Sequence, residues 1–171
     1  PAIISGDFNA TIAEDAVATG DLNAVDIEGL TDGTYFTLST APAHGTATIH
    51  PQSGNWTYTP NANYFGNDAF QVTVTDDLQG TTAANLQVIV TPVDDPAIIS
   101  GDFNATIAED AVATGDLNAV DIEGLTDGTY FTLTTAPAHG TATIHPQSGN
   151  WTYTPNANYF GNDAFQVTVT D

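Results

Sequence analysis

The chain has 171 residues, and its 21 aspartate and glutamate side chains are matched by no lysine or arginine, so the formal net charge at pH 7 is −21. Such a chain has no side chain with which to displace phosphate counterions, which argues against nucleic acid and anionic lipid as partners. Hydrophobic residues make up 41% of the sequence, enough to fill folded cores and to exclude a disordered chain.

Disulfides cannot stabilise this chain, because it contains no cysteine. A bound hard cation is the simplest remedy for its uncompensated negative charge. No apolar run approaches the ~20 residues that span a membrane, so we expect no direct membrane insertion. No signal peptide is present, and we expect the chain to be an interior segment of a longer protein.

The sequence repeats itself: residues 1–76 return as residues 96–171, with the single difference that Ser39 becomes Thr134. A period of 95 residues is too long for a solenoid unit and fits one small all-β domain. We predict a first repeat over residues 1–95, with a linker at about 91–96, and a second repeat over residues 96–171.

Within one repeat, side chains alternate with a period of two, and no long helical period is present. We expect a split first strand at residues 2–4 and 11–12, then strands at about 17–25, 36–38, 47–49, 56–59, 70–75 and 85–90. Turns rich in proline, glycine and asparagine separate these segments. Seven short strands in about 95 residues predict an antiparallel Ig-like β-sandwich.

The second repeat ends at the position that matches Asp76, so its equivalent of the last strand, around residues 86–90, is missing. We expect that strand to lie at an edge of the sandwich. Its loss should expose apolar surface and unpaired backbone groups. Continuation of the chain is the favoured source of the missing strand, and another chain is the alternative.

The acidic side chains fall mainly in the turns between the predicted strands. Consecutive strands of a sandwich run in alternating directions, so these turns lie at its two ends. We expect Glu14 and Asp68 at the end that leads to the next repeat, and Asp26, Glu28 and Asp76 at the opposite end.

Four segments, residues 1–7, 12–15, 42–46 and 56–68, resemble VCBS-type cadherin-like repeats, which form the extender regions of giant RTX adhesins of Gram-negative bacteria. The run at residues 74–97, where a strand ends in an aspartate and an acidic linker precedes a proline, is similar to the end of a cadherin-like repeat. This resemblance covers the whole chain. It implies tandem cadherin-like sandwiches outside the cell, with neighbouring repeats as partners and the adhesin's target bound by other domains.

The resemblance also implies Ca²⁺ between repeats, and carboxylates supply the oxygen ligands that this ion prefers. A junction cluster would take Glu14, Asp68, Asp94, Asp95, Asp121, Glu123 and Asp171. Half-sites at the outer ends would take Asp26, Glu28 and Asp76 at one end and Glu109 and Asp163 at the other. The alternative interpretation is that these acids only keep the surface solvated.

The sequence contains no catalytic constellation, and we expect no enzyme. His44 and His50 have turn contexts and are predicted to be turn or surface residues. Trp56 is predicted to pack in the core, with its indole N–H bonded to a backbone acceptor.

A second function remains open at this point, namely a carbohydrate- or protein-binding module that gains avidity from its tandem copies. Such a module would display a cluster of exposed aromatic side chains. Tyr35, Tyr64 and Phe65 are the candidates for that cluster.

Overall fold

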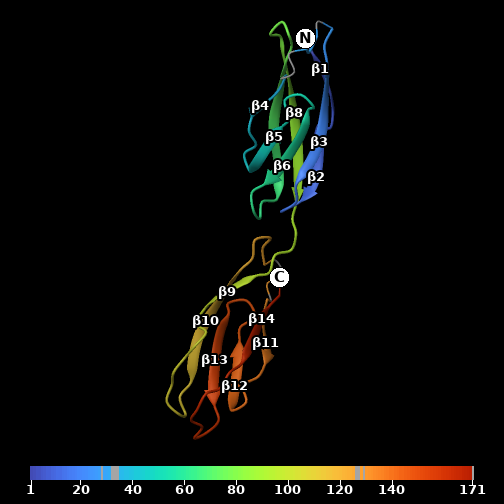
Figure 1. Ribbon diagram of the computed structural model, residues 1–171. Helices are drawn as coiled ribbons and strands as arrows, with labels where there is room; N and C mark the ends of the chain where they lie inside the picture. Colours follow the sequence, from blue (N-terminus) through green and yellow to red (C-terminus); the bar gives the residue numbers. More distant parts are fainter. Residues whose placement is uncertain (28, 32–34, 126–127, 129, 171) are drawn as a thin grey trace. The chain divides into compact units, whose positions relative to one another are not determined.

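The computed structural model of the chain describes all residues except 28, 32–34, 126–127, 129 and 171. The chain divides into two compact units, Pro1–Val93 and Asp94–Asp171. Both units are built from strands, as the period-two alternation predicts, and the described part of the chain contains no helix (Figure 1). Accordingly, nothing in that part is a helix long and apolar enough to cross a membrane.

Unit 1 is a sandwich of two four-stranded sheets, with the strand orders β1-β3-β6-β5 and β2-β8-β7-β4. Its strands are β1 (Ile3–Gly6), β2 (Asn9–Ala13), β3 (Ala18–Val25), β4 (Phe36–Thr40), β5 (Gly45–Ile49), β6 (Asn55–Pro60), β7 (Gly66–Thr75) and β8 (Thr81–Thr91). The predicted split first strand is confirmed, since β1 and β2 belong to different sheets.

The position of β8 differs from the prediction of an edge strand. It lies inside its sheet, parallel to β2 on one side and antiparallel to β7 on the other. The parallel pair is possible because the first strand splits, so that β2 follows the same direction as the last strand. The sandwich is therefore antiparallel except at this pair, and β8 holds two neighbours in place.

The core of unit 1 forms where the inward faces of β7 and β8 meet the other sheet. Alternate residues of β7 are buried, from Asp68 through Phe70 to Val74, and their neighbours point outward. Leu86 of β8 lies opposite Phe70 in the register and is fully buried. Trp56 packs edge-on against Phe70 with ring centroids 5.6 Å apart.

Trp56 confirms the prediction made for it, since its indole N–H donates to the backbone oxygen of Asp7 at 3.1 Å. Gly54 closes the hairpin before it, with a φ of 72° that favours glycine. A Cβ at this position would lie 2.0 Å from the backbone oxygen of Leu22, so only glycine fits here.

In its described residues unit 2 repeats the first sheet, in the order β12-β13-β10-β9, and pairs β11 with β14 in a second sheet (Figure 1). Its strands in the described residues are β9 (Ile98–Gly101), β10 (Ala113–Val120), β11 (Phe131–Thr135), β12 (Gly140–Ile144), β13 (Asn150–Pro155) and β14 (Gln166–Val169). The Ser39-to-Thr134 difference is conservative, since each hydroxyl donates to the backbone oxygen of the matching glutamine, Gln71 or Gln166.

Apolar side chains are exposed in the described residues of unit 2, which contain no counterpart of β8. Phe103 is 63% exposed, whereas its counterpart Phe8 packs against the core of unit 1. Residues 104–108, which match β2, form no strand. In unit 1 the strand that matches this segment, β2, pairs with β8, which also pairs with β7.

Candidate functional site

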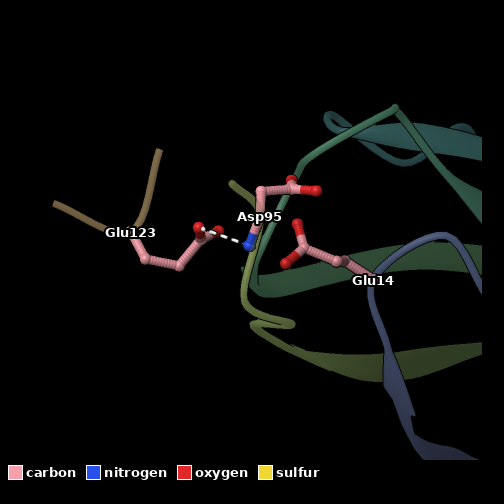
Figure 2. Close-up of side chains that lie close together, drawn as sticks. All are labelled: Glu14, Asp95 and Glu123. Carbon is pink, nitrogen blue, oxygen red and sulfur yellow. Dashed lines mark hydrogen bonds between the residues drawn. The ribbon is translucent and has the colours of Figure 1, made fainter. Parts of the chain in front are cut away.

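Hydrogen bonds connect three predicted acidic residues where the chain enters unit 2. Asp121 follows β10, and its Oδ1 accepts the backbone N–H groups of Glu123 and Gly124, both at 2.9 Å. This local turn aims the Glu123 side chain at the linker, where its Oε2 accepts the backbone N–H of Asp95 at 3.3 Å (Figure 2). These hydrogen bonds link the sequence-predicted residues Asp121, Glu123 and Asp95 in succession within unit 2.

Each of these three side chains keeps one carboxylate oxygen buried and without a hydrogen-bond donor among the described residues, namely Asp95 Oδ2, Asp121 Oδ2 and Glu123 Oε1. Burying an ionised oxygen without a partner is costly. The sequence has no lysine or arginine that could pair with them. An all-oxygen donor set that lacks a counter-charge fits a hard cation such as Ca²⁺.

Glu14 occupies the end of unit 1 from which the chain leaves. Its backbone N–H donates to Thr91 at 2.9 Å, and its Oε1 accepts the backbone N–H of Val93. The side chain, drawn in Figure 2, is only 4% exposed. Its second oxygen, Oε2, is buried and meets no donor in the described residues. Glu14 therefore has the same kind of orphaned oxygen as the three acids of unit 2.

Asp68 is placed differently. It lies opposite Val88 in the sheet, whereas Ala13, next to Glu14, lies opposite Thr91. Three residues of strand correspond to about 10 Å. Both carboxylate oxygens of Asp68 already accept hydrogen bonds, and the donors are Ala43 N, His44 N, Ala69 N and Tyr58 Oη. The structure thus explains this acid without a metal, and its role as a ligand stays a prediction.

The hydrogen bonds also set the titration of Asp68. Burial alone would raise the pKa of its carboxyl, but the donors from His44, Ala43, Ala69 and Tyr58 hold that pKa below its ordinary value. Burial raises the pKa of the Tyr58 hydroxyl, and the hydrogen bond and negative charge of the same carboxylate raise it further. Asp163 repeats this arrangement in unit 2, and its pKa is lowered in the same way.

At the opposite end of unit 1, Asp76 closes its own turn, since its Oδ1 accepts Leu78 N at 2.9 Å and Gly80 N at 2.6 Å. Asp26 lies 3.4 Å from the amino group of Pro1. Asp77, which is not among the predicted ligands, accepts the backbone N–H and the hydroxyl of Thr31.

The remaining predicted ligands are Asp94 and Glu109, which are exposed, and Glu28 and Asp171, which lie outside the described residues. Glu109 matches the buried Glu14 in sequence. The difference follows from β8, because in unit 1 the chain after this strand covers the glutamate.

Most of the aromatic candidates for a recognition surface pack within the fold. Tyr35 and Tyr64 are half-buried against the core, and Phe65 is 39% exposed. The Tyr64 hydroxyl donates to the backbone oxygen of Asn67 at 2.7 Å, and its ring stacks on His44. These contacts give Tyr64 a structural role. His50 lies in a turn, as predicted, where its Nδ1 accepts the N–H groups of Gln52 and Ser53.

Comparison with known families and structures agrees with this architecture. The family described as "Bacterial Ig domain" matches residues 1–89 and 94–171. No curated protein matches the sequence of this chain.

Among solved structures, the chain is similar to extracellular cadherin domains 1–5 of protocadherin gamma B2, with 12% identity and a TM-score of 0.61, over 99% of this chain and 39% of that one. It is also similar to a structure of domains EC1–4 of PcdhgB3, with 11% identity and a TM-score of 0.60, over 92% of this chain and 41% of that one. The chain thus spans about two fifths of these proteins, and the likeness shows an Ig/cadherin-like fold.

Proposed function

This chain belongs to the bacterial Ig domain family, and from that premise we propose that its two units are non-catalytic spacer repeats of a large bacterial surface adhesin. In this proposal they are VCBS-type extender repeats of an RTX adhesin, displayed outside a Gram-negative cell, and other domains bind the target. Two nearly identical sandwiches in tandem support a spacing role, because repetition adds length without adding chemistry.

We further propose that Ca²⁺ bound by Glu14, Asp95, Asp121 and Glu123 stiffens the junction between the units. The supporting observation is that each of these side chains has one buried oxygen with no donor among the described residues. When no ion is bound, the carboxylates repel one another. A bound cation turns that repulsion into a shared ligand shell and removes freedom from the linker.

The covalent chain supports a shared ion. The Glu14 carboxylate accepts the N–H of Val93, and the Glu123 carboxylate accepts the N–H of Asp95. These two amides are two residues apart, a span of at most about 7 Å. An ion that recruits both glutamates therefore requires no long linker to fold back.

The stabilisation expected from one calcium ion is small in absolute terms, but it is large compared with the stability of a small domain. Extracellular calcium modules bind with Kd values of about 10⁻⁴–10⁻³ M. At free calcium about a hundredfold above Kd, one site stabilises the folded state by about 2.7 kcal/mol. That is a substantial part of the free energy of unfolding of a typical native protein, which is about 5–15 kcal/mol.

Titration calorimetry and small-angle X-ray scattering on the full chain test this function. We expect saturable heat of calcium binding, together with a larger maximum dimension and a higher melting temperature in millimolar calcium than in chelator. Equal dimensions and equal melting temperatures in the two buffers would overturn the calcium-stiffened spacer.

A further inference from the structure

The acidic side chains are distributed unevenly over each repeat. Residues 33–67 contain no aspartate or glutamate, although the chain has a net charge of −21, and they include all of β4, β5 and β6. In the strand orders of unit 1, β5 and β4 are end strands of the two sheets, and they lie in contact with each other (Figure 1). Both sheet edges on this side of the sandwich are therefore built from acid-free strands.

The four edge strands of unit 1 differ in their protection against pairing with another chain, which charged residues and bulges usually provide. β1 is followed directly by Asp7, and β2 by Glu14. β4 has a shift in its register between Leu38 and Thr40. By contrast, β5 carries no charged side chain, and its register with β6 is uninterrupted. Among the described strands of unit 1, β5 is thus the edge that lacks these protections.

The side chains of β5 suit pairing with an identical strand. Thr46 and Thr48 are exposed, and Ala47 between them is half-buried against the core. The sequence Thr-Ala-Thr reads the same in both directions. In an antiparallel pair centred on Ala47, each Thr46 therefore lies opposite Thr48 of the other copy, and the two Ala47 residues lie opposite each other.

Threonine pairs of this kind already join the strands of the sheet. Thr48 lies opposite Thr57 of β6, and their hydroxyl oxygens are 2.7 Å apart. Thr57 in turn lies opposite Thr19 of β3. Cross-strand threonine pairs stabilise antiparallel sheets. A second β5 would extend this row of hydroxyls across the interface without bringing charged side chains of the two strands together.

We propose that two copies of this chain associate edge to edge through β5, in the antiparallel register centred on Ala47, so that two sheets become one. β12 has the same sequence and an uninterrupted register in unit 2, so each copy carries this edge twice. The edge is self-complementary, as a two-fold interface requires. Two chains of net charge −21 repel each other, and an acid-free edge is where they can approach closely. This lateral contact goes beyond the spacer function and does not depend on calcium.

Sedimentation equilibrium of the intact chain in chelator, over a range of protein and salt concentrations, tests the association. We expect a monomer–dimer equilibrium that shifts toward the dimer as salt screens the charge. The edge variant combines Thr46→Glu, Thr48→Glu, Thr141→Glu and Thr143→Glu. It places like charges opposite each other, and we expect association to weaken about tenfold or more. A control adds the same charge at exposed positions of β3 and β10 and should weaken association much less, namely Thr19→Glu, Asn23→Glu, Thr114→Glu and Asn118→Glu.

Cysteine crosslinking tests the register, because the chain has no cysteine of its own. One variant carries Thr46→Cys with Thr141→Cys, and the other carries Thr48→Cys with Thr143→Cys. We expect disulfide-linked dimers when the two variants are mixed and oxidised, and few when each is oxidised alone. The reason is that equal positions are diagonal neighbours, about 7–8 Å apart, which is beyond the reach of a disulfide.

Three results would overturn the proposal. The first is a chain that stays monomeric at every protein and salt concentration. The second is an equal dissociation constant for the edge variant and its control, which would assign association to another surface. The third is equal crosslinking of the mixed and the separate cysteine variants, which would show contact without the proposed register.

Discussion

The Tyr58 hydroxyl donates a hydrogen bond to Asp68 Oδ2 at 2.9 Å in the core of unit 1, and Tyr153 donates to Asp163 over the same distance in unit 2. In unit 1 this aspartate joins three structural elements, because Tyr58 of β6 and backbone N–H groups from the turn before β5 and from β7 meet the same carboxylate. In a chain without lysine or arginine, this buried carboxylate is stabilised by oriented hydrogen-bond donors alone.

The first prediction concerns removal of this acceptor. Asp68→Ala leaves the Tyr58 hydroxyl and the backbone donors unpaired, and it is expected to lower the free energy of unfolding of unit 1 by about 3 kcal/mol, because an orphaned buried group costs about 1–3 kcal/mol. Tyr58→Phe removes one donor of several and should cost about 1 kcal/mol. Urea unfolding, followed by NMR at the indole signals of Trp56 and Trp151, separates the two units. Equal losses of unfolding free energy from the two substitutions would contradict the expectation that removal of the acceptor costs more than removal of one donor.

The second prediction concerns acid. The folded pKa of Asp68 and Asp163 lies below the ordinary value, and an unfolded aspartate titrates near a pKa of about 3.9. Their stabilisation is therefore present above that pH and is lost as the pH falls through the folded pKa. The difference in unfolding free energy between the parent chain and Asp68→Asn should be constant near neutral pH and shrink below about pH 4. Urea titrations at several pH values measure it, and a difference that does not change in acid would refute the linkage.

The inward position of Asp68 was available from the sequence. It stands two residues before Phe70 in a run whose alternate residues, Phe70, Val72 and Val74, form the inward face. Period two therefore places this carboxylate in the core, whereas its position before the predicted strand of Phe70 had suggested a turn at the end of the sandwich. The period identified the strands correctly, and its extension by one step would have placed Asp68 on the inward face, although not beside Tyr58.

The order of strands could not be read from the sequence in the same way. Alternation predicts that Leu86, Val88 and Val90 are buried, and they are. It says nothing about which strands lie beside them, because pairing partners are distant in the chain. The central position of β8 depends on β2 running parallel to it. Likewise, turn acids such as Glu14 were predictable as end residues, but their orphaned oxygens depend on which backbone N–H groups lie within reach.

The third prediction concerns the contact between Gly20 and Trp56. A Cβ at position 20 would lie 2.5 Å from Cζ2 of the indole ring, whose N–H is bonded to Asp7. Gly20→Ala must displace the ring, and we expect a loss of about 1–3 kcal/mol from overpacking. The indole N–H signal of Trp56 should shift while that of Trp151 stays in place. Thr19→Ala, at the exposed neighbouring position, is the matched control. An unchanged Trp56 signal would show that the site accommodates the added methyl group without moving the ring, and would contradict the prediction.

The fourth prediction separates calcium binding from general charge relief. The double variant Asp95→Asn with Glu123→Gln removes two of the orphaned carboxylates, and we expect it to abolish the rise in melting temperature on calcium addition while each sandwich stays folded. The control variant, Asp21→Asn with Asp116→Asn, removes the same number of charges from exposed strand positions and should keep the full calcium response. Differential scanning calorimetry with calcium and with chelator compares the variants. If both variants lost the calcium response equally, relief of net charge alone would account for the effect of the cation. Loss in the first variant only would assign the response to calcium bound by the carboxylates around Asp95, because a ligand shell requires specific oxygen atoms.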